Sequence, residues 1–142
     1  MVMALIPQQF MNVRYDGSRF PGAPGVSGVA EGANCQQFAY ELLRHFGYSV
    51  PDLRSSELWE DTEYTYRAGT LEPFDLLLFS ADGKAFGAHV GVYLGDEKVI
   101  HLSKEAGFPE IRELAWFQNT PRYCTLLGTK RCRVKHATQD GR

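Results

Sequence analysis

Three residues have types and spacing that could perform nucleophilic catalysis: Cys35, His89 and His101. A thiol attacks as the thiolate, and an adjacent imidazole can remove its proton. A second polar group can hold that imidazole in the tautomer that accepts the proton. The sequence therefore predicts a small cysteine hydrolase with Cys35 as nucleophile, His89 as general base and His101 as the group that orients the base.

The predicted nucleophile opens the clearest helix of the sequence. Apolar residues recur at helical spacing from Cys35 to Phe46, and Gly47 follows as a natural stop. Asn34 suits the N-cap, and Gln37 could complete a capping box. Cys35 then lies in the first turn, where unpaired amides favour a thiolate and the apolar stripe directs the sulfur toward a sheet.

The two histidines belong to a predicted β-hairpin formed by His89–Leu94 and Lys98–Ser103. Aliphatic residues alternate with the histidines, so pairing the aliphatic sets on one face places both imidazoles on the other. A loop over Gly95–Glu97, or another odd length, would bring their β carbons within roughly 5 to 8 Å. An unbulged two-residue turn would put them on opposite faces. Gly91, on the histidine face, is expected to leave room for a substrate backbone.

Other interpretations of these residues remain open. A lone cysteine at this position can be a small buried hydrophobic residue, and a lone strand histidine can be a hydrogen-bonded core residue. One Cys and two His also form a known catalytic zinc set, but no other metal-ligand cluster accompanies them. We expect no metal and no cofactor.

The remaining elements predict an α+β fold. The Gly- and Pro-rich segment from Asp16 to Gly32 is expected to be a loop that forms one wall of a cleft, with a plain surface excursion as the alternative. A short helix is expected over Ser55–Glu60, a buried strand over Asp75–Ser80 and a further strand within Tyr123–Val134. One early helix followed by mainly antiparallel strands is the α+β pattern.

Size and charge limit the possible functions. The 142 residues suit one domain over residues 1–142, with a frayed tail over 137–142. The net charge of −2 argues against a dedicated nucleic-acid or anionic-membrane surface. The basic cluster Lys130, Arg131, Arg133 and Lys135 is interpreted as a solvated strand edge, with phosphate binding as the alternative.

No export signal or disulfide framework is expected. The apolar run near the start is interrupted by Pro7, and no stretch approaches the roughly 20 residues of a spanning helix. A cytoplasmic location and delivery by a signal-independent route therefore both stay open. Three cysteines without a Cys-x-x-Cys pair leave at least one free thiol, and Cys124 and Cys132 are expected to be small core residues.

Three segments resemble the NlpC/P60 family of papain-like cysteine peptidases. Asn34–Ala39 resembles the family's nucleophile motif, usually an Asp-Cys-Ser-Gly type sequence that opens a helix. Pro73–Phe79 resembles its Pro-Gly-Asp-Leu strand. His89–Gly95 followed by Val99–His101 resembles its histidine hairpin and is the most specific match. The resemblance covers about residues 34 to 103 and implies a papain-like fold with Cys35, His89 and His101 in the catalytic positions.

The family typically cleaves amide bonds in peptidoglycan stem peptides, often between γ-D-glutamyl and a diamino acid, so the resemblance implies such a peptide as partner. Asn34 and Gln36 replace the family's usual Asp and Ser, and Phe74 stands where Gly is common. Tyr15 is the best match to a family tyrosine near the oxyanion region. Tyr15 and Asn34 are therefore the candidate substrate or oxyanion residues.

Two other functions stay open. A CHAP-type amidase, or another thiol amidase or acyltransferase, could share the Cys and His layout while acting on a different substrate. A non-catalytic binding module could also keep the fold, and it would carry an ordinary thiol. An immunity or inhibitor protein would be a further partner if the chain acts as a toxin.

Overall fold

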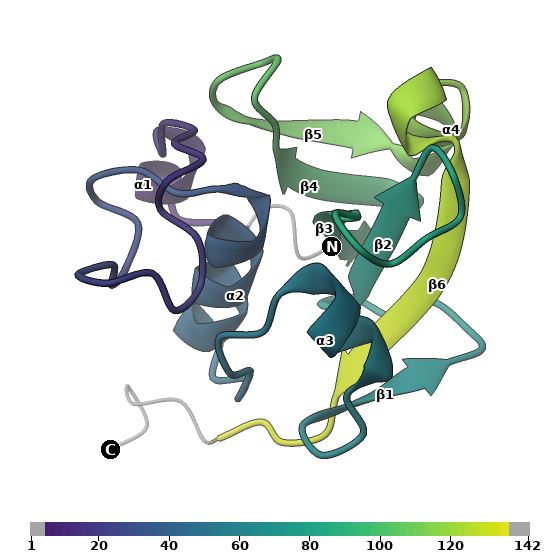
Figure 1. The fold of residues 1–142 in the computed structure, drawn as a ribbon, viewed down its shortest axis with the longest axis horizontal. Helices are drawn as coiled ribbons and strands as arrows, with labels where there is room; N and C mark the ends of the chain where they lie inside the picture. Colours follow the sequence, from purple (N-terminus) through teal and green to yellow (C-terminus); the bar gives the residue numbers. More distant parts are fainter. Residues whose placement is uncertain (1–4, 137–142) are drawn as a thin grey trace.

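A six-stranded antiparallel sheet organises the chain (Figure 1). The computed structural model describes residues 5–136. The strand order is β1-β6-β2-β3-β4-β5. The strands are β1 (Thr65–Ala68), β2 (Leu76–Ser80), β3 (His89–Gly95), β4 (Lys98–Leu102), β5 (Pro109–Glu113) and β6 (Thr125–Cys132).

Helical segments cover both faces of the sheet. They are α1 (Gln8–Met11), α2 (Cys35–His45), α3 (Ser55–Glu60), α4 (Leu114–Gln118) and the 3₁₀ turn η2 (Pro121–Tyr123). Along β2, Leu76 and Leu78 pack in the cluster that includes α2, whereas Leu77 and Phe79 pack with residues of α4 and η2. Because successive strand residues face opposite sides, one buried strand serves two cores. The expected α+β class is confirmed.

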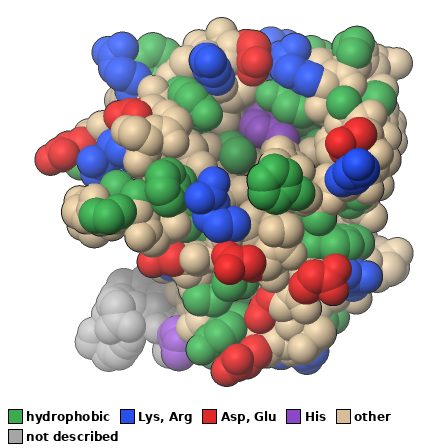
Figure 2. Space-filling view, viewed as in Figure 1, with side chains coloured by type: hydrophobic (Ala, Val, Ile, Leu, Met, Phe, Trp, Pro, Cys, Tyr) green, Lys and Arg blue, Asp and Glu red, His purple; other side chains and the backbone are tan. Residues whose placement is uncertain are grey.

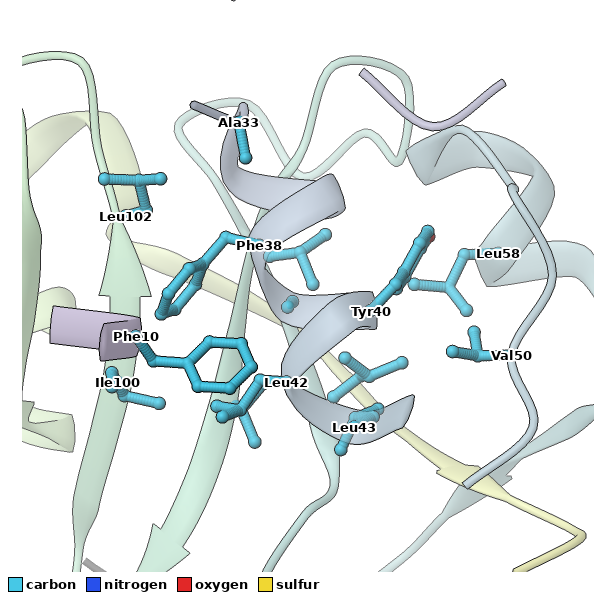
Figure 3. Close-up of a cluster of buried hydrophobic side chains, with 14 of the residues drawn as sticks. Phe10, Ala33, Phe38, Tyr40, Leu42, Leu43, Val50, Leu58, Ile100 and Leu102 are labelled. Carbon is cyan, nitrogen blue, oxygen red and sulfur yellow. The ribbon is translucent and has the colours of Figure 1, made fainter. Parts of the chain in front are cut away.

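The α2 helix packs its apolar face on β3 and β4 (Figure 3). Phe38, Leu42 and Leu43 are completely buried in this core. The Asn34 side chain accepts a hydrogen bond from the backbone N–H of Gln37 at 2.8 Å, which confirms the predicted N-cap. The capping box is wrong, because the Gln37 side-chain amide donates instead to the Gly28 carbonyl at 3.1 Å.

The histidine hairpin contains a bulge that the sequence did not reveal. Val92 lies opposite Ile100, but Gly95 lies opposite Lys98, so the register shifts at Leu94. Asp96 and Glu97 form a two-residue turn with positive φ angles of 52° and 64°. The extra residue restores the alternation that an unbulged two-residue turn would have inverted. Both histidines therefore share one face, as predicted.

Other expectations divide into confirmed and wrong. The short helix over Ser55–Glu60 and the strand that begins after Asp75 are confirmed. β1, β5, α4 and η2 were not anticipated. The expected tail over 137–142 lies outside the described residues. No helix within residues 5–136 has the length and apolarity needed to cross a membrane.

The interpretation of the basic cluster as a solvated strand edge is wrong for Lys130 and Arg131, whereas Arg133 and Lys135 are exposed as expected. β6 is an interior strand, between β1 and β2. Lys130 is 1% exposed, and its ammonium donates to the backbone carbonyls of Trp59 and Asp61 at the end of α3. Arg131 binds the buried Asp75 carboxylate through two N–H groups at 2.8 and 2.9 Å. These two cations therefore hold the fold together instead of facing solvent.

The expectation for the two later cysteines is half right. Cys132 is partly buried and packs against the main core. Cys124 is exposed, because it lies between η2 and the start of β6 and not within the strand. Cys35, Cys124 and Cys132 are all free thiols.

Candidate active site

The start of α2 meets the start of β3 at a hollow in the surface. Figure 2 shows a histidine side chain at the bottom of a hollow whose rim carries basic and hydrophobic side chains. Cys35, the first residue of α2, is partly buried there, and its sulfur is close to the backbone N–H groups of Gln36 and Val90. The thiol therefore faces the sheet, as the helical pattern predicted.

The resting state of the thiol differs from the expectation. Burial raises the pKa of Cys35, and this effect outweighs the opposing contributions of the Val90 and Gln36 amides and the Arg54 charge. The helix N-terminus was expected to lower this pKa, but it only limits the rise. Cys35 is therefore a neutral thiol at rest, which needs a base to become a nucleophile.

The two histidines contact each other directly. His89 Nε2 and His101 Nδ1 are 2.8 Å apart, and the rings are nearly perpendicular. This hydrogen bond involves one nitrogen of each ring. Nδ1 of His89 takes no part in it. Because these two nitrogens share a proton with each other, they cannot both bind one metal ion in this arrangement. The geometry therefore argues against the zinc alternative.

Burial keeps both imidazoles neutral. The pKa of His89 lies well below its ordinary value because of burial, followed by the influence of His101 and Arg122. Burial lowers the pKa of His101 to about 4, although the nearby Glu110 carboxylate opposes this change. A neutral imidazole is the form that can accept a proton.

Aromatic side chains hold the pair of imidazoles in place. The Tyr123 ring stacks on His89, with centroids 4.3 Å apart and an interplanar angle of 20°. Phe117 and Trp116 lie against His101 at centroid distances of 4.7 and 5.5 Å. These contacts come from α4 and η2, which the sequence reasoning did not locate.

A carboxylate behind the histidines was also missed. Glu110 Oε1 lies 3.5 Å from Nε2 of His101. The alternation of apolar and charged residues from Pro109 to Arg112 was a usable strand signal. Only the pairing of β5 with β4, which places Glu110 opposite His101, reveals the contact.

Two pockets meet at the thiol. The first, here called the Arg54 pocket, has a volume of about 510 Å³ and is lined by Asn34, Cys35, Arg54 and others. The second, here called the Tyr123 pocket, has a volume of about 240 Å³ and is lined by Cys35, His89, Tyr123 and others. The two pockets share Tyr15, Cys35, Gly87 and Ala88, so they adjoin at the thiol.

The weaker candidates lie in these pockets as well. Tyr15 lines both pockets, and its pKa is raised by burial first and then by Cys35 and acidic neighbours, so its hydroxyl remains protonated. Asn34 lines the Arg54 pocket while its side chain caps α2. Gln36 lines the same pocket, and its buried Oε1 has no hydrogen-bond partner among the described residues.

Two expectations about the cleft are wrong. Gly91 does not leave room for a substrate, since a β carbon there would lie 2.7 Å from Val99 and 3.6 Å from the His101 β carbon. Its missing side chain makes room for the neighbouring strand. The loop 16–32 contributes no lining residue to the Arg54 or Tyr123 pocket, whose nearby wall is instead Tyr15 and Asn34.

The thiol and the imidazoles share a pocket without a direct bond. Cys35 and His89 both line the Tyr123 pocket, but no hydrogen bond between the thiol and either histidine occurs in the part of the chain that the structure describes. Contacts of this kind are often loose in a ligand-free site and tighten when substrate binds. The structure therefore brings the three predicted residues to one place, with the two histidines in contact.

The sequence is similar to those of known proteins. A family model described as the NlpC/P60 family matches residues 17–124. A curated relative from Bacillus subtilis (strain 168), a gamma-D-glutamyl-L-lysine dipeptidyl-peptidase, is 33% identical over 109 residues that cover 69% of this chain and 33% of that protein. The chain thus spans about a third of the length of this curated relative.

Solved structures share the fold. An NlpC/P60 family protein from Bacillus cereus superposes with a TM-score of 0.56 at 25% identity, covering 72% of this chain and 32% of that one. The peptidoglycan hydrolase RipB from Mycobacterium tuberculosis gives a TM-score of 0.59 at 19% identity, covering 94% of this chain and 63% of that one. The second likeness, at its low identity, supports the papain-like fold alone.

Proposed function

Because the chain belongs to the NlpC/P60 family, a family of cysteine peptidases and hydrolases, we propose that it cleaves an amide bond in peptidoglycan stem peptides. The observation that carries the proposal is the hydrogen-bonded histidine pair, of which His89 lines the same pocket as Cys35. A buried thiol beside neutral imidazoles suits proton transfer from sulfur to nitrogen.

The proposed reaction begins with that transfer. The Cys35 thiol gives its proton to Nδ1 of His89, and the sulfur forms a bond to the amide carbonyl carbon. The carbonyl oxygen becomes an oxyanion, which the Cys35 backbone N–H at the start of α2 stabilises. The Tyr15 hydroxyl is our candidate for the second donor, because it is protonated and lines both pockets.

The intermediate then collapses. His89 donates its proton to the leaving nitrogen, the C–N bond breaks, and the acyl group remains on Cys35 as a thioester. Water enters, gives a proton to His89 and attacks the thioester carbon. The second intermediate collapses as the C–S bond breaks, and His89 returns its proton to the sulfur. The products are a carboxylic acid, which loses its proton to solvent, and the regenerated thiol. His101 keeps its contact with His89 throughout, so that the base does not turn away from the sulfur.

The proposed substrate class follows from the curated relative. That protein's name specifies a γ-D-glutamyl-L-lysine bond, and the Arg54 pocket offers a cation beside the thiol. We therefore propose the bond between γ-D-glutamyl and a diamino acid as the cleavage point. We also propose that residues 1–142 form a single catalytic domain.

Product analysis tests this proposal. Purified peptidoglycan and synthetic stem peptides that carry either L-lysine or diaminopimelate are incubated with the protein, and the products are identified by mass spectrometry. We expect a new amino terminus at the diamino acid and a new carboxylate on the glutamyl residue. Cleavage at another amide bond would instead support a CHAP-type or other thiol amidase.

The same digest addresses the binding-module alternative. A non-catalytic module would release no new amine from any of these substrates. It could still bind a labelled stem peptide in a pull-down experiment. His89→Ala is the matched inactive control, because it removes the proposed base while leaving Cys35 in place.

A further inference from the structure

We propose that Glu110 is a positioning residue that sets the direction of the hydrogen bond between the two histidines, and so makes His89 a base. The inference rests on the proposed function. It concerns which tautomers His89 and His101 adopt, because contacts within the pair do not determine them.

The direction of the hydrogen bond between the histidines is ambiguous because the orienting residue, His101, is itself an imidazole. A neutral imidazole has one N–H and one bare nitrogen, and either can face a neighbour. If His101 donates from Nδ1, His89 must accept at Nε2 and carry its own proton on Nδ1. The nitrogen remaining for the thiol would then be a donor, and His89 could not act as base. If His101 accepts at Nδ1, the opposite holds and His89 Nδ1 is free to accept a proton.

Glu110 selects the second arrangement. Its Oε1 lies 3.5 Å from Nε2 of His101, and Nε2 is buried without a hydrogen-bond partner among residues 5–136. A carboxylate can only accept, so it favours a proton on Nε2 of His101 and a bare Nδ1. His89 must then donate from Nε2 across the 2.8 Å contact, which leaves its Nδ1 bare. The separation of 3.5 Å is long for a hydrogen bond, and we expect it to shorten when His89 becomes cationic.

Arg112 and the sheet register keep Glu110 in place. Arg112 donates from Nη2 to Oε2 of Glu110 at 3.1 Å and from Nε to Oε1 at 3.4 Å. The β4–β5 register puts Glu110 directly opposite His101, on adjacent strands. The charged or titratable groups that face His101 are His89 from β3, Glu110 and Arg112 from β5, and Arg122 and Tyr123 from η2. Of these, Glu110 is the one whose acceptor lies at Nε2 of His101, whereas His89 faces Nδ1.

The tautomers can be read directly from the wild-type protein. Long-range ¹H–¹⁵N spectra of ¹⁵N-histidine-labelled protein, at a pH where both rings are neutral, show which nitrogen carries the proton. We expect the proton on Nε2 in both His89 and His101. A proton on Nδ1 of His101 in the wild-type protein would overturn the proposal, whatever the protein's substrate is.

Variants separate this role from a general effect on stability. Glu110→Ala should lower kcat about 100-fold with KM nearly unchanged, because loss of the acceptor populates the unproductive tautomer and Glu110 lines neither the Arg54 nor the Tyr123 pocket. The spectra should show the Nδ1–H form of His101 appearing. Glu110→Gln, whose amide oxygen can still accept, should keep more activity than Glu110→Ala.

A glutamate on the same strand provides the matched control. Glu113 forms an ion pair with Lys98 and is exposed, so Glu113→Ala should leave kcat and both tautomers as in the wild type. Glu110→Ala with kcat within twofold of the wild type, or with unchanged histidine tautomers, would overturn the proposal. If no variant cleaves stem peptides but the tautomers follow the expected pattern, the proposed substrate fails and the positioning role stands.

Discussion

At the residue scale, burial decides which protonation states the candidate catalytic groups hold at rest. It raises the pKa of Cys35 and lowers the pKa of His89, so both groups are neutral in the ligand-free protein. The residue types and their spacing sufficed to name these residues from the sequence. Their protonation states could not be predicted, because desolvation depends on side chains such as Tyr123 that are distant in the sequence.

The lowered pKa of His89 leads to a prediction about activity. In the proposed mechanism the neutral imidazole of His89 is the active form, and protonation removes it only below its pKa, which lies well under 6.5. We therefore expect kcat/KM to stay level as the pH falls to 6.5 and to decline only in more acidic solution. A series of initial rates on a soluble stem peptide measures this; a decline centred at or above pH 6.5 would count against a buried neutral base.

Tyr15 gives a second prediction at this scale. If its hydroxyl is the second oxyanion donor, Tyr15→Phe should lower kcat by about 100-fold while the ring and its packing remain. Steady-state rates with the same peptide test this. Unchanged kcat would show that another group supplies the donor and would restrict Tyr15 to lining the pockets.

At the element scale, alternation predicted what faces where, and local backbone detail escaped prediction. The alternation of aliphatic and histidine positions in the hairpin correctly placed His89 and His101 on one face. The bulge at Leu94 did not show in the sequence, because it depends on how β3 and β4 pair. The start of α2 was predictable because Asn34 is a cap that acts within a few residues.

The backbone of Phe74 is strained, and this strain leads to a prediction about stability. Phe74 follows α3 and β1 in the chain, just before β2, with a positive φ of 74°, where a glycine would be unstrained. Its ring packs against Phe46 and Tyr48 at centroid distances of 4.8 and 5.4 Å, which offsets the strain. Phe74→Gly and Phe74→Ala both lose this packing, but only alanine keeps the backbone strain.

We therefore expect Phe74→Ala to be less stable than Phe74→Gly by about 1 kcal/mol. Chemical denaturation of the two variants beside the wild type measures the difference. An alanine variant at least as stable as the glycine variant would show that the backbone relaxes at this position.

At the scale of the whole molecule, long-range pairing defines the site. The sequence predicted the α+β class and the meeting of a helix with a hairpin. It could not predict that β5, α4 and η2 would surround the histidines, since these contacts join residues far apart in the chain. The prediction of solvent exposure was wrong for Lys130 for the same reason, because only the sheet order reveals that this residue is buried.

The buried histidines also couple global stability to pH. His101 has a pKa of about 4 in the folded protein and an ordinary value of 6.5 when exposed. Between these values the unfolded chain binds a proton that the folded chain does not. The contribution of His101 is therefore complete above pH 6.5 and is lost as the pH falls toward 4, by at most about 1.4 kcal/mol per pH unit.

Denaturant unfolding of the wild type and of His101→Gln across this pH range tests the coupling. The variant should be less stable at neutral pH but show a shallower dependence on pH. Carboxylates remote from the site affect both proteins alike, so the difference between the slopes reports His101 together with its contacts His89 and Glu110. Equal slopes would mean that His101 titrates normally in the folded state.

The most direct test of thiol catalysis compares two single cysteine variants on a stem peptide with a γ-D-glutamyl-diamino acid bond. Turnover by Cys35→Ala should fall by at least about a thousandfold, with its melting temperature close to that of the wild type. Cys124→Ala, which removes an exposed thiol, should cleave at the wild-type rate. Cleavage by folded Cys35→Ala within tenfold of the wild-type rate would contradict the account.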